Sequence, residues 1–549
     1  MTTPGDTEFE QILDATGRSE ETTRQLRALE NRTLTDRLWD SLATTPQRER
    51  VVRAVGPVAV VLLAAGTRLW NLGNPKTLVF DETFYVKDAY TLSRLGYEGS
   101  WPPNPDPKFA AGDVNDYLRA GSFVVHPPLG KWIISLGYDW LGVTNPVSWR
   151  IMTAIVGILA VVLLMMIAKY LFKSTLVATI AGFLMAIDGN AIVMSRVGLL
   201  DNFVMFFALL GFGAVLLDRR WSAVRLSLWI AKREGGGRST DWGPALWWRP
   251  WLLLAGLAFG FDSAVKWNGI YFLAGLALYT LAADVFARRD AGVANWIHGT
   301  ILKQGPTTFL LMIPIAAAAY LTSWTGWFVT KGGYDRNYAD LPGNAWKGAL
   351  AWVPHSLQSW WNFEGQVWYY NINEHSPHPY AANPLTWLLM IRPTSMYFSS
   401  ANEGQNGCTV SFCGSSITGI ANPLIWYAGV AAAIYLVYRL IRFREWRVGI
   451  ILAGLGAGYL PWLMYTSRTV FQFYTIAFEP YLLLAIAFVV SQLIGVRGHN
   501  EYRRAIGMRW IAVFLVAAVA ISVFFWPLWT GIQIDFKYMQ LHYWLPSWE

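Results

Sequence analysis

Charged residues are scarce in this chain. Asp, Glu, Lys and Arg make up 15% of its 549 residues, whereas 54% are hydrophobic. One soluble core cannot bury that much apolar surface, and the apolar residues recur in runs of about twenty, the length that spans a bilayer as a helix. The composition therefore excludes an ordinary soluble protein and predicts an all-α polytopic integral membrane protein.

A short apolar segment near the N-terminus is also missing. Residues 1–50 are polar and rich in charge, so no cleavable signal peptide is expected and 1–50 is predicted to be a cytoplasmic tail. Arg48, Arg50 and Arg53 precede the first apolar run, which places this end in the cytoplasm by the positive-inside rule. The rest of the chain, 51–549, is expected to form one transmembrane domain.

The basic and aromatic residues fit this class. A net charge of +8 would suit a nucleic-acid partner, but the basic residues lie between the apolar runs, so no nucleic acid is predicted. The chain contains 30 Trp and 25 Tyr. Such rings suit the two membrane interfaces, where an apolar body needs a wet edge.

Hydropathy predicts about eleven membrane spans. They are expected at 55–70, 147–171, 175–187, 203–217, 251–265, 269–286, 309–328, 423–441, 448–465, 476–496 and 510–529. Clusters of Lys and Arg fall on every second loop between them, as the positive-inside rule requires. An odd number of spans then leaves the C-terminus on the extracytoplasmic side.

This topology leaves two large extracytoplasmic segments, near 71–145 and 329–421. Neither is charged enough to indicate disorder, and both are expected to pack on the membrane surface as short amphipathic helices. The only two cysteines, Cys408 and Cys413, lie in the second segment. On an oxidising side of the membrane they most simply form a small disulfide-closed turn. Zinc is the weaker alternative, because no ligand pair of the usual spacing lies nearby.

A metal site is not predicted elsewhere either. His375 and His378 are close in sequence, but each is followed within two residues by a proline, Pro377 or Pro379, which favours a rigid loop contact. No cofactor is therefore predicted, and dependence on a divalent metal stays open.

Polar residues gather at the predicted outer ends of the spans. Asp81 and Glu82 form an adjacent carboxylate pair shortly after the first span, and two adjacent acids at a membrane surface are costly unless they have a role. The other members of this set are His126, Lys131, Arg150, Asp188, Arg196, Asp201, Asn202, Asp262, Lys266, Asn268, Arg392 and Arg468. Each taken singly could be a snorkelling side chain or part of a local ion pair. Together they predict a polar floor at the outer leaflet.

This combination of residues predicts a glycosyl transfer from a lipid phosphate. A carboxylate can take the proton of an acceptor hydroxyl as its oxygen attacks the anomeric carbon opposite the leaving group. A departing phosphate needs positive charge rather than a general acid, and arginine binds two of its oxygens at once. Asp81 or Glu82 supplies the base and the arginines supply the charge.

Six short motifs, in this order and at these topological positions, resemble those of the protein O-mannosyltransferases. They are Phe80-Asp81-Glu82-Thr83, His126-Pro127-Pro128-Leu129-Gly130-Lys131, Trp149-Arg150, Leu199-Leu200-Asp201-Asn202, Lys266-Trp267-Asn268-Gly269 and Arg468 with Phe473-Tyr474. The resemblance covers nearly the whole chain beyond the tail. It is to the bacterial branch of the kind found in actinobacteria.

The resemblance implies a GT-C fold in the cell membrane, a polyprenyl-phosphate-mannose donor, and inverting transfer to Ser or Thr of secreted proteins. The secretion translocon is a further expected partner. By residue, it implies that Asp81 is the base and that Glu82 is its partner or contacts the acceptor backbone. Arg150 is expected to be needed for activity. The remaining residues expected to contact the donor phosphate or substrate are Arg392, Arg468, His126, Lys131, Arg196 and Asp201.

The sequence departs from the family in one respect and leaves two alternatives. Fungal and animal members carry a soluble MIR domain in the second large segment, and 329–421 is too short for one. A related GT-C transferase acting on a glycolipid or wall polysaccharide would share the carboxylates and arginines. A secondary transporter should show an internal repeat and helices broken at mid-membrane, and the sequence shows neither.

Overall fold

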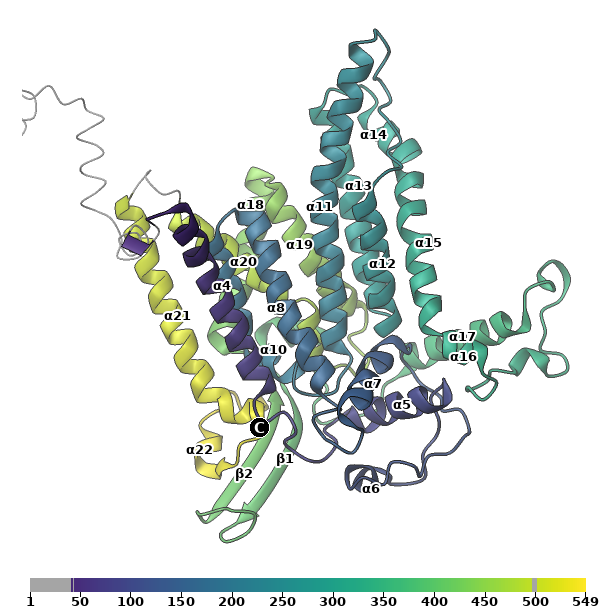
Figure 1. Ribbon diagram of the computed structural model, residues 1–549, viewed down its shortest axis with the longest axis vertical. Helices are drawn as coiled ribbons and strands as arrows, with labels where there is room; N and C mark the ends of the chain where they lie inside the picture. The colour runs from purple at the N-terminus through teal and green to yellow at the C-terminus, as the bar shows by residue number, and fades with distance from the viewer. Residues whose placement is uncertain (1–40, 43, 496–500) are drawn as a thin grey trace, which may run out of the picture.

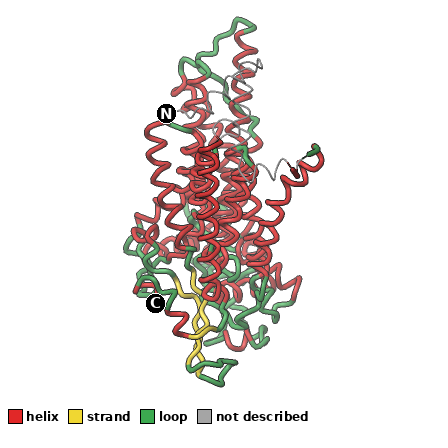
Figure 2. The backbone as a smooth tube through the Cα atoms, turned by 90° about the vertical axis from the view of Figure 1, so that its left-hand side faces the viewer, coloured by secondary structure: helices red, strands yellow, loops and turns green. Residues whose placement is uncertain are grey.

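The computed structural model describes residues 41–42, 44–495 and 501–549. Most of the predicted tail, residues 1–40 and 43, lies outside this part of the chain. Figure 1 shows a bundle of upright helices, with short helices and a β hairpin gathered at its lower end. The turned view of Figure 2 places the strands and the C-terminus at that same end.

Eight helical segments are long and apolar enough to cross a membrane, and three shorter apolar helices accompany them among the described residues. The long ones contain α4 (Pro46–Leu69), α8 (Ile151–Phe172), α11 (Asp201–Glu234), α13 (Gly269–Asp290), α14 (Trp296–Gly299) continued by a π-helical turn (Thr300–Gln304) and α15 (Gly305–Ser323), α18 (Pro423–Phe443), α19 (Trp446–Tyr459) and α21 (Glu501–Thr530). The shorter ones are α9 (Thr175–Ile187), α12 (Pro250–Val265) and α20 (Glu479–Ile494).

These helices lie at the eleven predicted positions, but their ends differ. The largest difference is α11, which continues to Glu234 where the predicted span ends at 217. Its second half is an amphipathic stretch in which arginines stack on tryptophans one turn away: Arg225 lies 5.0 Å from the Trp221 ring and Arg233 lies 4.8 Å from the Trp229 ring. A hydropathy window detects only the apolar half of such a helix.

The buried helices of the bundle include α8, α11, α12 and α20. Most of the apolar windows of α8 and α11 are buried, whereas α4 is exposed along most of its length. α12 packs between α11 and α15. Gly260 permits the contact with α15, because a Cβ there would lie 2.5 Å from the carbonyl oxygen of Ala316. Close approach at small residues is the usual way in which membrane helices associate.

The two large segments between spans fold over the lower end of the bundle (Figure 1). The first contains α5 (Glu82–Leu95), α6 (Asp106–Ala110) and α7 (Leu129–Leu141). The second contains α16 (Thr325–Val329) and α17 (His355–Asn373), with short 3-10 turns at Tyr338–Asp340, Gly348–Leu350 and Pro384–Leu389. A short α10 (Gly189–Met194) follows α9, and 3-10 turns at Leu460–Met464, Gln472–Ala477 and Pro546–Trp548 complete this end with α22 (Phe536–Gln540).

The expectation of an all-α fold is wrong in one place. The second large segment also contains β1 (Thr394–Asn402) and β2 (Phe412–Gly419), which pair antiparallel from Thr394 opposite Gly419 to Asn402 opposite Phe412. A short β3 (Ile534–Asp535) near the C-terminus adds to β2. Thr, Ser and aromatic residues fill β1, a composition that favours a half-buried pleated surface over a helix.

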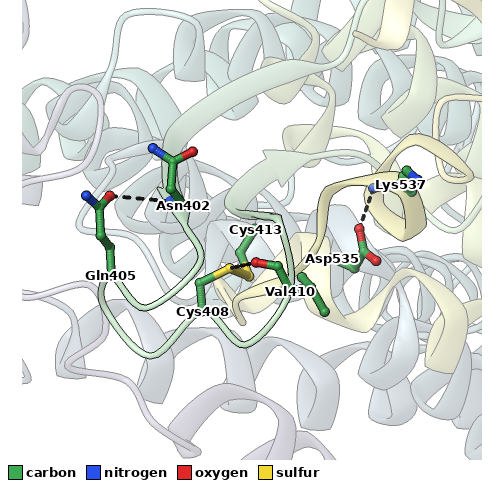
Figure 3. The surroundings of a disulfide bond; sticks show 7 residues. All are labelled: Asn402, Gln405, Cys408, Val410, Cys413, Asp535 and Lys537. Carbon is green, nitrogen blue, oxygen red and sulfur yellow. Dashed lines mark hydrogen bonds between the residues drawn. A yellow bond between two sulfur atoms is a disulfide. The ribbon is translucent and has the colours of Figure 1, made fainter.

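A disulfide bond between Cys408 and Cys413 closes the loop of this hairpin (Figure 3). Cys413 belongs to β2 and lies opposite Asp535 of β3. The loop is therefore held at the edge of the small sheet.

Candidate active site

Glu82, the first residue of α5, is completely enclosed and fully hydrogen-bonded. Its Oε1 accepts from Arg150 Nε and from the backbone N–H of Gly198, both at 2.7 Å. Its Oε2 accepts from Arg150 Nη2 at 2.7 Å and from the N–H of Val79 at 2.8 Å. A carboxylate with four such contacts has no lone pair left for a substrate.

Asp81, one residue earlier, has a different environment. It is only half-buried, and the hydroxyl of Tyr85 donates one long hydrogen bond of 3.5 Å to its Oδ2. Burial raises the pKa of Asp81 to about 6, while the nearby Lys266 ammonium lowers it and Asp201 raises it. The carboxylate is thus a stronger base than an ordinary aspartate and remains ionised at neutral pH.

Lys266 and Asp201 form an ion pair beside Asp81. Lys266 Nζ donates to Asp201 Oδ1 at 3.0 Å and to Oδ2 at 2.8 Å. The same ammonium lies 4.5 Å from the centre of the Tyr474 ring. Lys266 directly follows α12 and Asp201 begins α11, so the pair is held by the ends of these two helices. The turn after Lys266 requires a glycine, because a Cβ at Gly269 would lie 2.4 Å from the backbone nitrogen of Ser263.

His126 lies in the same cluster. Burial and the positive charges of Lys266, Lys131 and Arg468 hold the pKa of His126 well below its usual range. Its ring is therefore neutral at physiological pH, so one ring nitrogen can donate a hydrogen bond and the other can accept one. The ring centre lies 5.9 Å from that of Tyr85.

A narrow space, the inner cavity, opens between these groups and α17. Its lining includes His126, Asp201, Lys266, Trp267, Asn371 and Arg468, and its volume is about 70 Å³. Arg468 Nη2 donates to Asn371 Oδ1 at 2.8 Å, whereas its Nε has no hydrogen-bond partner and is buried. A buried, unpaired N–H of a guanidinium beside an ammonium is suited to an anion.

Three other predicted arginines are engaged by the protein itself. Besides Glu82, Arg150 donates to the carbonyl oxygens of Pro75 and Thr77, both at 2.9 Å. Arg196 donates to carbonyls in the last turn of α4 and just after it, the shortest of these bonds being 2.6 Å to Trp70.

Arg392 donates to Pro379 O at 3.0 Å and to Ser547 O at 2.6 Å, which ties the second large segment to the C-terminus. None of these three arginines lines the inner cavity. Their geometry favours positioning roles over the predicted contact with a donor phosphate.

The remaining predicted residues lie further from the cavity. Lys131 is buried, pairs with Glu98, and donates to the carbonyl oxygen of His126 at 3.1 Å, so it fixes the backbone of that residue. His375 donates from Nδ1 to Ser467 O at 2.9 Å, whereas Nδ1 of His378 accepts from the N–H of Tyr380. Within the described residues, no three His, Cys, Asp or Glu side chains are grouped so that they could hold a metal ion.

Sequence reasoning missed the contribution of α17. A hydrogen-bond chain joins this helix to the cavity wall: Trp267 Nε1 donates to Tyr320 Oη at 2.9 Å, and Tyr320 donates to Glu364 Oε1 at 2.8 Å. Glu364 and Asn371 lie on α17, in a stretch that hydropathy identifies only as aromatic and loop-like. No local sequence signal links them to Trp267 or Arg468.

The sequence matches two family models. The model described as dolichyl-phosphate-mannose-protein mannosyltransferase matches residues 58–327, and the one described as the C-terminal four TMM region of protein-O-mannosyltransferase matches residues 356–548. The polyprenol-phosphate-mannose–protein mannosyltransferase of Mycolicibacterium smegmatis (strain MKD8) is 31% identical over 89% of this chain and 92% of its own length. The protein of the same description from Corynebacterium glutamicum is 30% identical over 89% of this chain and 92% of its own.

The fold has a counterpart among solved structures. The Saccharomyces cerevisiae protein O-mannosyltransferase Pmt1-Pmt2 complex bound to the sugar donor aligns with a TM-score of 0.66 and 14% identity, covering 94% of this chain and 95% of the matched one. At that identity the likeness concerns the fold alone.

Proposed function

This chain belongs to the protein O-mannosyltransferase family, and we propose that it uses Asp81 as the base that takes the proton from the acceptor hydroxyl. It is a membrane-embedded glycosyltransferase with a GT-C fold, and its activity is the transfer of mannose from polyprenol-phosphate-mannose to protein. Our proposal concerns the identity of the base, the residues that bind the donor, and the side of the membrane on which the active site lies.

The choice of Asp81 over Glu82 rests on one observation. The Glu82 carboxylate already accepts four hydrogen bonds, from Arg150, Val79 and Gly198. The Asp81 carboxylate accepts only one long hydrogen bond. A group that must receive a proton needs a free lone pair directed at the substrate. Glu82 and Arg150 are then positioning residues, which fix the start of α5 and with it the backbone of Asp81.

The reaction follows from these positions. The Asp81 carboxylate takes the proton of a Ser or Thr hydroxyl as the hydroxyl oxygen forms a bond to the anomeric carbon of mannose. The bond between that carbon and the phosphate oxygen breaks, and the electron pair leaves with the polyprenyl phosphate. A single displacement of this kind inverts the anomeric centre.

Lys266 and Arg468 provide the positive charge for the leaving phosphate. Both line the inner cavity, and the unpaired Nε of Arg468 is a donor available to a phosphate oxygen. Preorganised charge that meets a developing anion lowers the barrier without further rearrangement. Asp201 keeps the Lys266 ammonium in place through its bidentate contact.

We assign the active site to the outer face of the cell membrane. The site lies at the end of the bundle that carries the two large segments, and the basic loops lie at the other end, which the positive-inside rule assigns to the cytoplasm (Figure 1). Acceptors on this face are Ser/Thr/Pro-rich secreted proteins, reached while they are still unfolded after passage through the secretion translocon.

The test is transfer of labelled mannose from polyprenyl-phosphate-mannose to a Ser/Thr/Pro-rich peptide by purified Asp81→Asn. We expect activity to fall by about two to four orders of magnitude, because the substitution keeps the shape and removes the proton acceptor. Thermal unfolding should be unchanged, since Asp81 makes only one long hydrogen bond.

Glu82→Gln and Asp113→Asn serve as comparisons. Glu82→Gln weakens the buried contact with Arg150, so its loss of activity should be accompanied by a lower unfolding temperature. Asp113 is an exposed carboxylate of the same segment, and Asp113→Asn should behave like the wild type. Near wild-type turnover in Asp81→Asn contradicts the proposed base, and labelling of lipid instead of peptide contradicts the proposed acceptor.

A further inference from the structure

A second and wider hollow runs along the other side of α17. Its volume is about 730 Å³, ten times that of the inner cavity. Aromatic side chains dominate its walls, and we call it the aromatic groove. The residues that define it here are Phe123, Tyr334, Trp361, Asn362, Tyr369 and Tyr370.

The aromatic groove and the inner cavity meet along one line. Phe123 borders the groove, and three residues later His126 borders the cavity. On α17, Tyr370 borders the groove and the next residue, Asn371, borders the cavity. The two walls touch, because the Phe123 and Tyr370 ring centres are 6.0 Å apart and Asn371 Nδ2 donates to Val125 O at 3.5 Å. A ligand leaving the groove in this direction arrives beside His126.

The side chains of the groove suit an extended polypeptide. Trp361 and Tyr369 are 64% and 69% exposed, so their faces are open to a ligand. Aromatic faces of this kind bind proline in extended, polyproline II-like segments, and side-chain amides between them pair with the peptide backbone. The amide nitrogen of Asn362 is buried and has no hydrogen-bond partner, which leaves a donor for a backbone carbonyl.

Charge argues against other occupants. Among the described residues that line the groove there is no Lys or Arg, and Glu374 adds a negative charge. Phosphate-bearing lipid headgroups need cations, and those are found instead in the inner cavity. A neutral segment rich in Ser, Thr, Pro and Ala fits both the rings and the charge.

We propose that the aromatic groove binds an extended, proline-containing stretch of the acceptor polypeptide and so delivers a neighbouring Ser or Thr hydroxyl to Asp81. This inference rests on the proposed function. Because the groove borders the inner cavity without being part of it, the residue that the groove recognises is a few positions away from the modified hydroxyl.

The test compares acceptor peptides in the full-length enzyme. We substitute Trp361→Ala together with Tyr369→Ala, two exposed rings whose removal leaves the core intact. The KM for a long Pro-containing acceptor should rise about tenfold, with kcat and the donor KM unchanged, because binding common to ground state and transition state is lost. A tripeptide acceptor, which reaches only the inner cavity, should react equally with both enzymes.

Trp352→Ala is the matched control, since Trp352 is 78% exposed in the same segment but does not line the groove. Moving a single proline along the acceptor should give the lowest KM at one position a few residues from the hydroxyl. An unchanged KM for the long peptide in the double variant overturns the groove proposal.

A defect seen only with a peptide that already carries mannose assigns the groove to sugar, which also overturns the proposal. If the wild-type enzyme transfers mannose to no peptide of either length, the proposed function fails, and that result is distinct from either outcome.

Discussion

At Asp81, two neighbouring charges of opposite sign act on one carboxylate. Burial raises its pKa to about 6; the Lys266 ammonium opposes that shift and the Asp201 carboxylate adds to it. Only the ionised form of Asp81 can accept a proton from the acceptor. The rate should therefore fall as the pH drops through about 6. The pH at which it falls, the acid limb of the pH profile, depends on the opposing effects of Lys266 and Asp201 on the pKa of Asp81.

Substitution of these two neighbours should move the acid limb of kcat/KM in opposite directions. In Lys266→Met the ionised Asp81 loses its favourable partner, so the limb moves to higher pH. In Asp201→Asn a repelling charge is removed and Lys266 is freed to face Asp81, so the limb moves to lower pH. The measurement is the pH dependence of the residual transfer rate in each variant.

Lys108→Met is the control, because Lys108 lies on the same large segment but is exposed and pairs with Asp116. Its limb should coincide with that of the wild type. Shifts of the same sign in Lys266→Met and Asp201→Asn would show that the titrating group is not Asp81.

The sequence predicts that the adjacent acids Asp81 and Glu82 have a functional role, but it does not predict which of them is the base. Asp81 and Glu82 stand out because two carboxylates follow a membrane span. Which one is free depends on Arg150, 68 positions away, and on the N–H of Gly198, 116 positions away. Contacts between distant parts of the chain also bind Arg150 to Glu82, so it is not free to contact the phosphate, whereas Arg468 keeps an Nε without a partner. Residue type and spacing do not encode these distances.

Among the elements, α17 is tied by polar side chains both to the helical bundle and to the segment after α19. Tyr320 of α15 connects it to Trp267, and Arg468 connects it to the segment that follows α19. Burial raises the pKa of Glu364, the α17 end of the first connection, to about 7. Because one helix borders both the inner cavity and the aromatic groove, its position sets the width of both.

Removing the Tyr320 hydroxyl should loosen α17. Tyr320→Phe takes away the acceptor of Trp267 Nε1 and the donor to Glu364 at once, which leaves two buried polar groups without partners. We expect faster amide hydrogen exchange across 355–373 and about a tenfold lower kcat/KM, with exchange in α20 unchanged. Hydrogen exchange with mass spectrometry measures the first and the mannose-transfer assay the second.

Tyr502→Phe is a suitable comparison, because the Tyr502 side chain is 70% exposed. It should leave both readouts at wild-type values. Wild-type exchange in 355–373 of Tyr320→Phe would mean that packing alone holds α17.

The helical elements were largely predictable and the hairpin was not. Runs of about twenty apolar residues mark the long bundle helices, and within such a single segment an α-helix satisfies all backbone groups inside a bilayer. The second large segment lies outside the bilayer, where that constraint ends. There β1 and β2 form because residues 394–402 pair with 412–419 across a disulfide-closed loop, a tertiary contact that hydropathy does not detect.

At the scale of the whole molecule, the two ends of the helical bundle carry different structures. The two large segments, the hairpin and the C-terminus share one end, while the long α11 and the short α14 reach the other (Figures 1 and 2). α11 has 34 residues and is about 50 Å long, so it exceeds a hydrocarbon core of about 30 Å. We therefore expect its basic second half to extend beyond the membrane, at the end that we assign to the cytoplasm.

Reporter fusions test this orientation. A reporter after Glu549 and one inserted at Gly343 should both be extracytoplasmic, and one inserted at Gly236, just past α11, should be cytoplasmic. Alkaline phosphatase, which is active only outside, and green fluorescent protein, which fluoresces only inside, give opposite signals at each position. A cytoplasmic signal at Glu549 would contradict the odd number of spans and the proposed common face of the site.

The narrowness of the inner cavity also bears on a competing reaction, hydrolysis of the donor. A space of about 70 Å³ holds only a few water molecules, and Trp267 and Trp368 line it with their rings 6.1 Å apart. We infer that the mannosyl phosphate displaces that water as it binds beside Lys266 and Arg468, so little water remains there to compete with the acceptor hydroxyl. Mannose bound without an acceptor is then expected to be protected from loss to solvent, and the lipid-linked sugar to remain at the site until a secreted chain arrives.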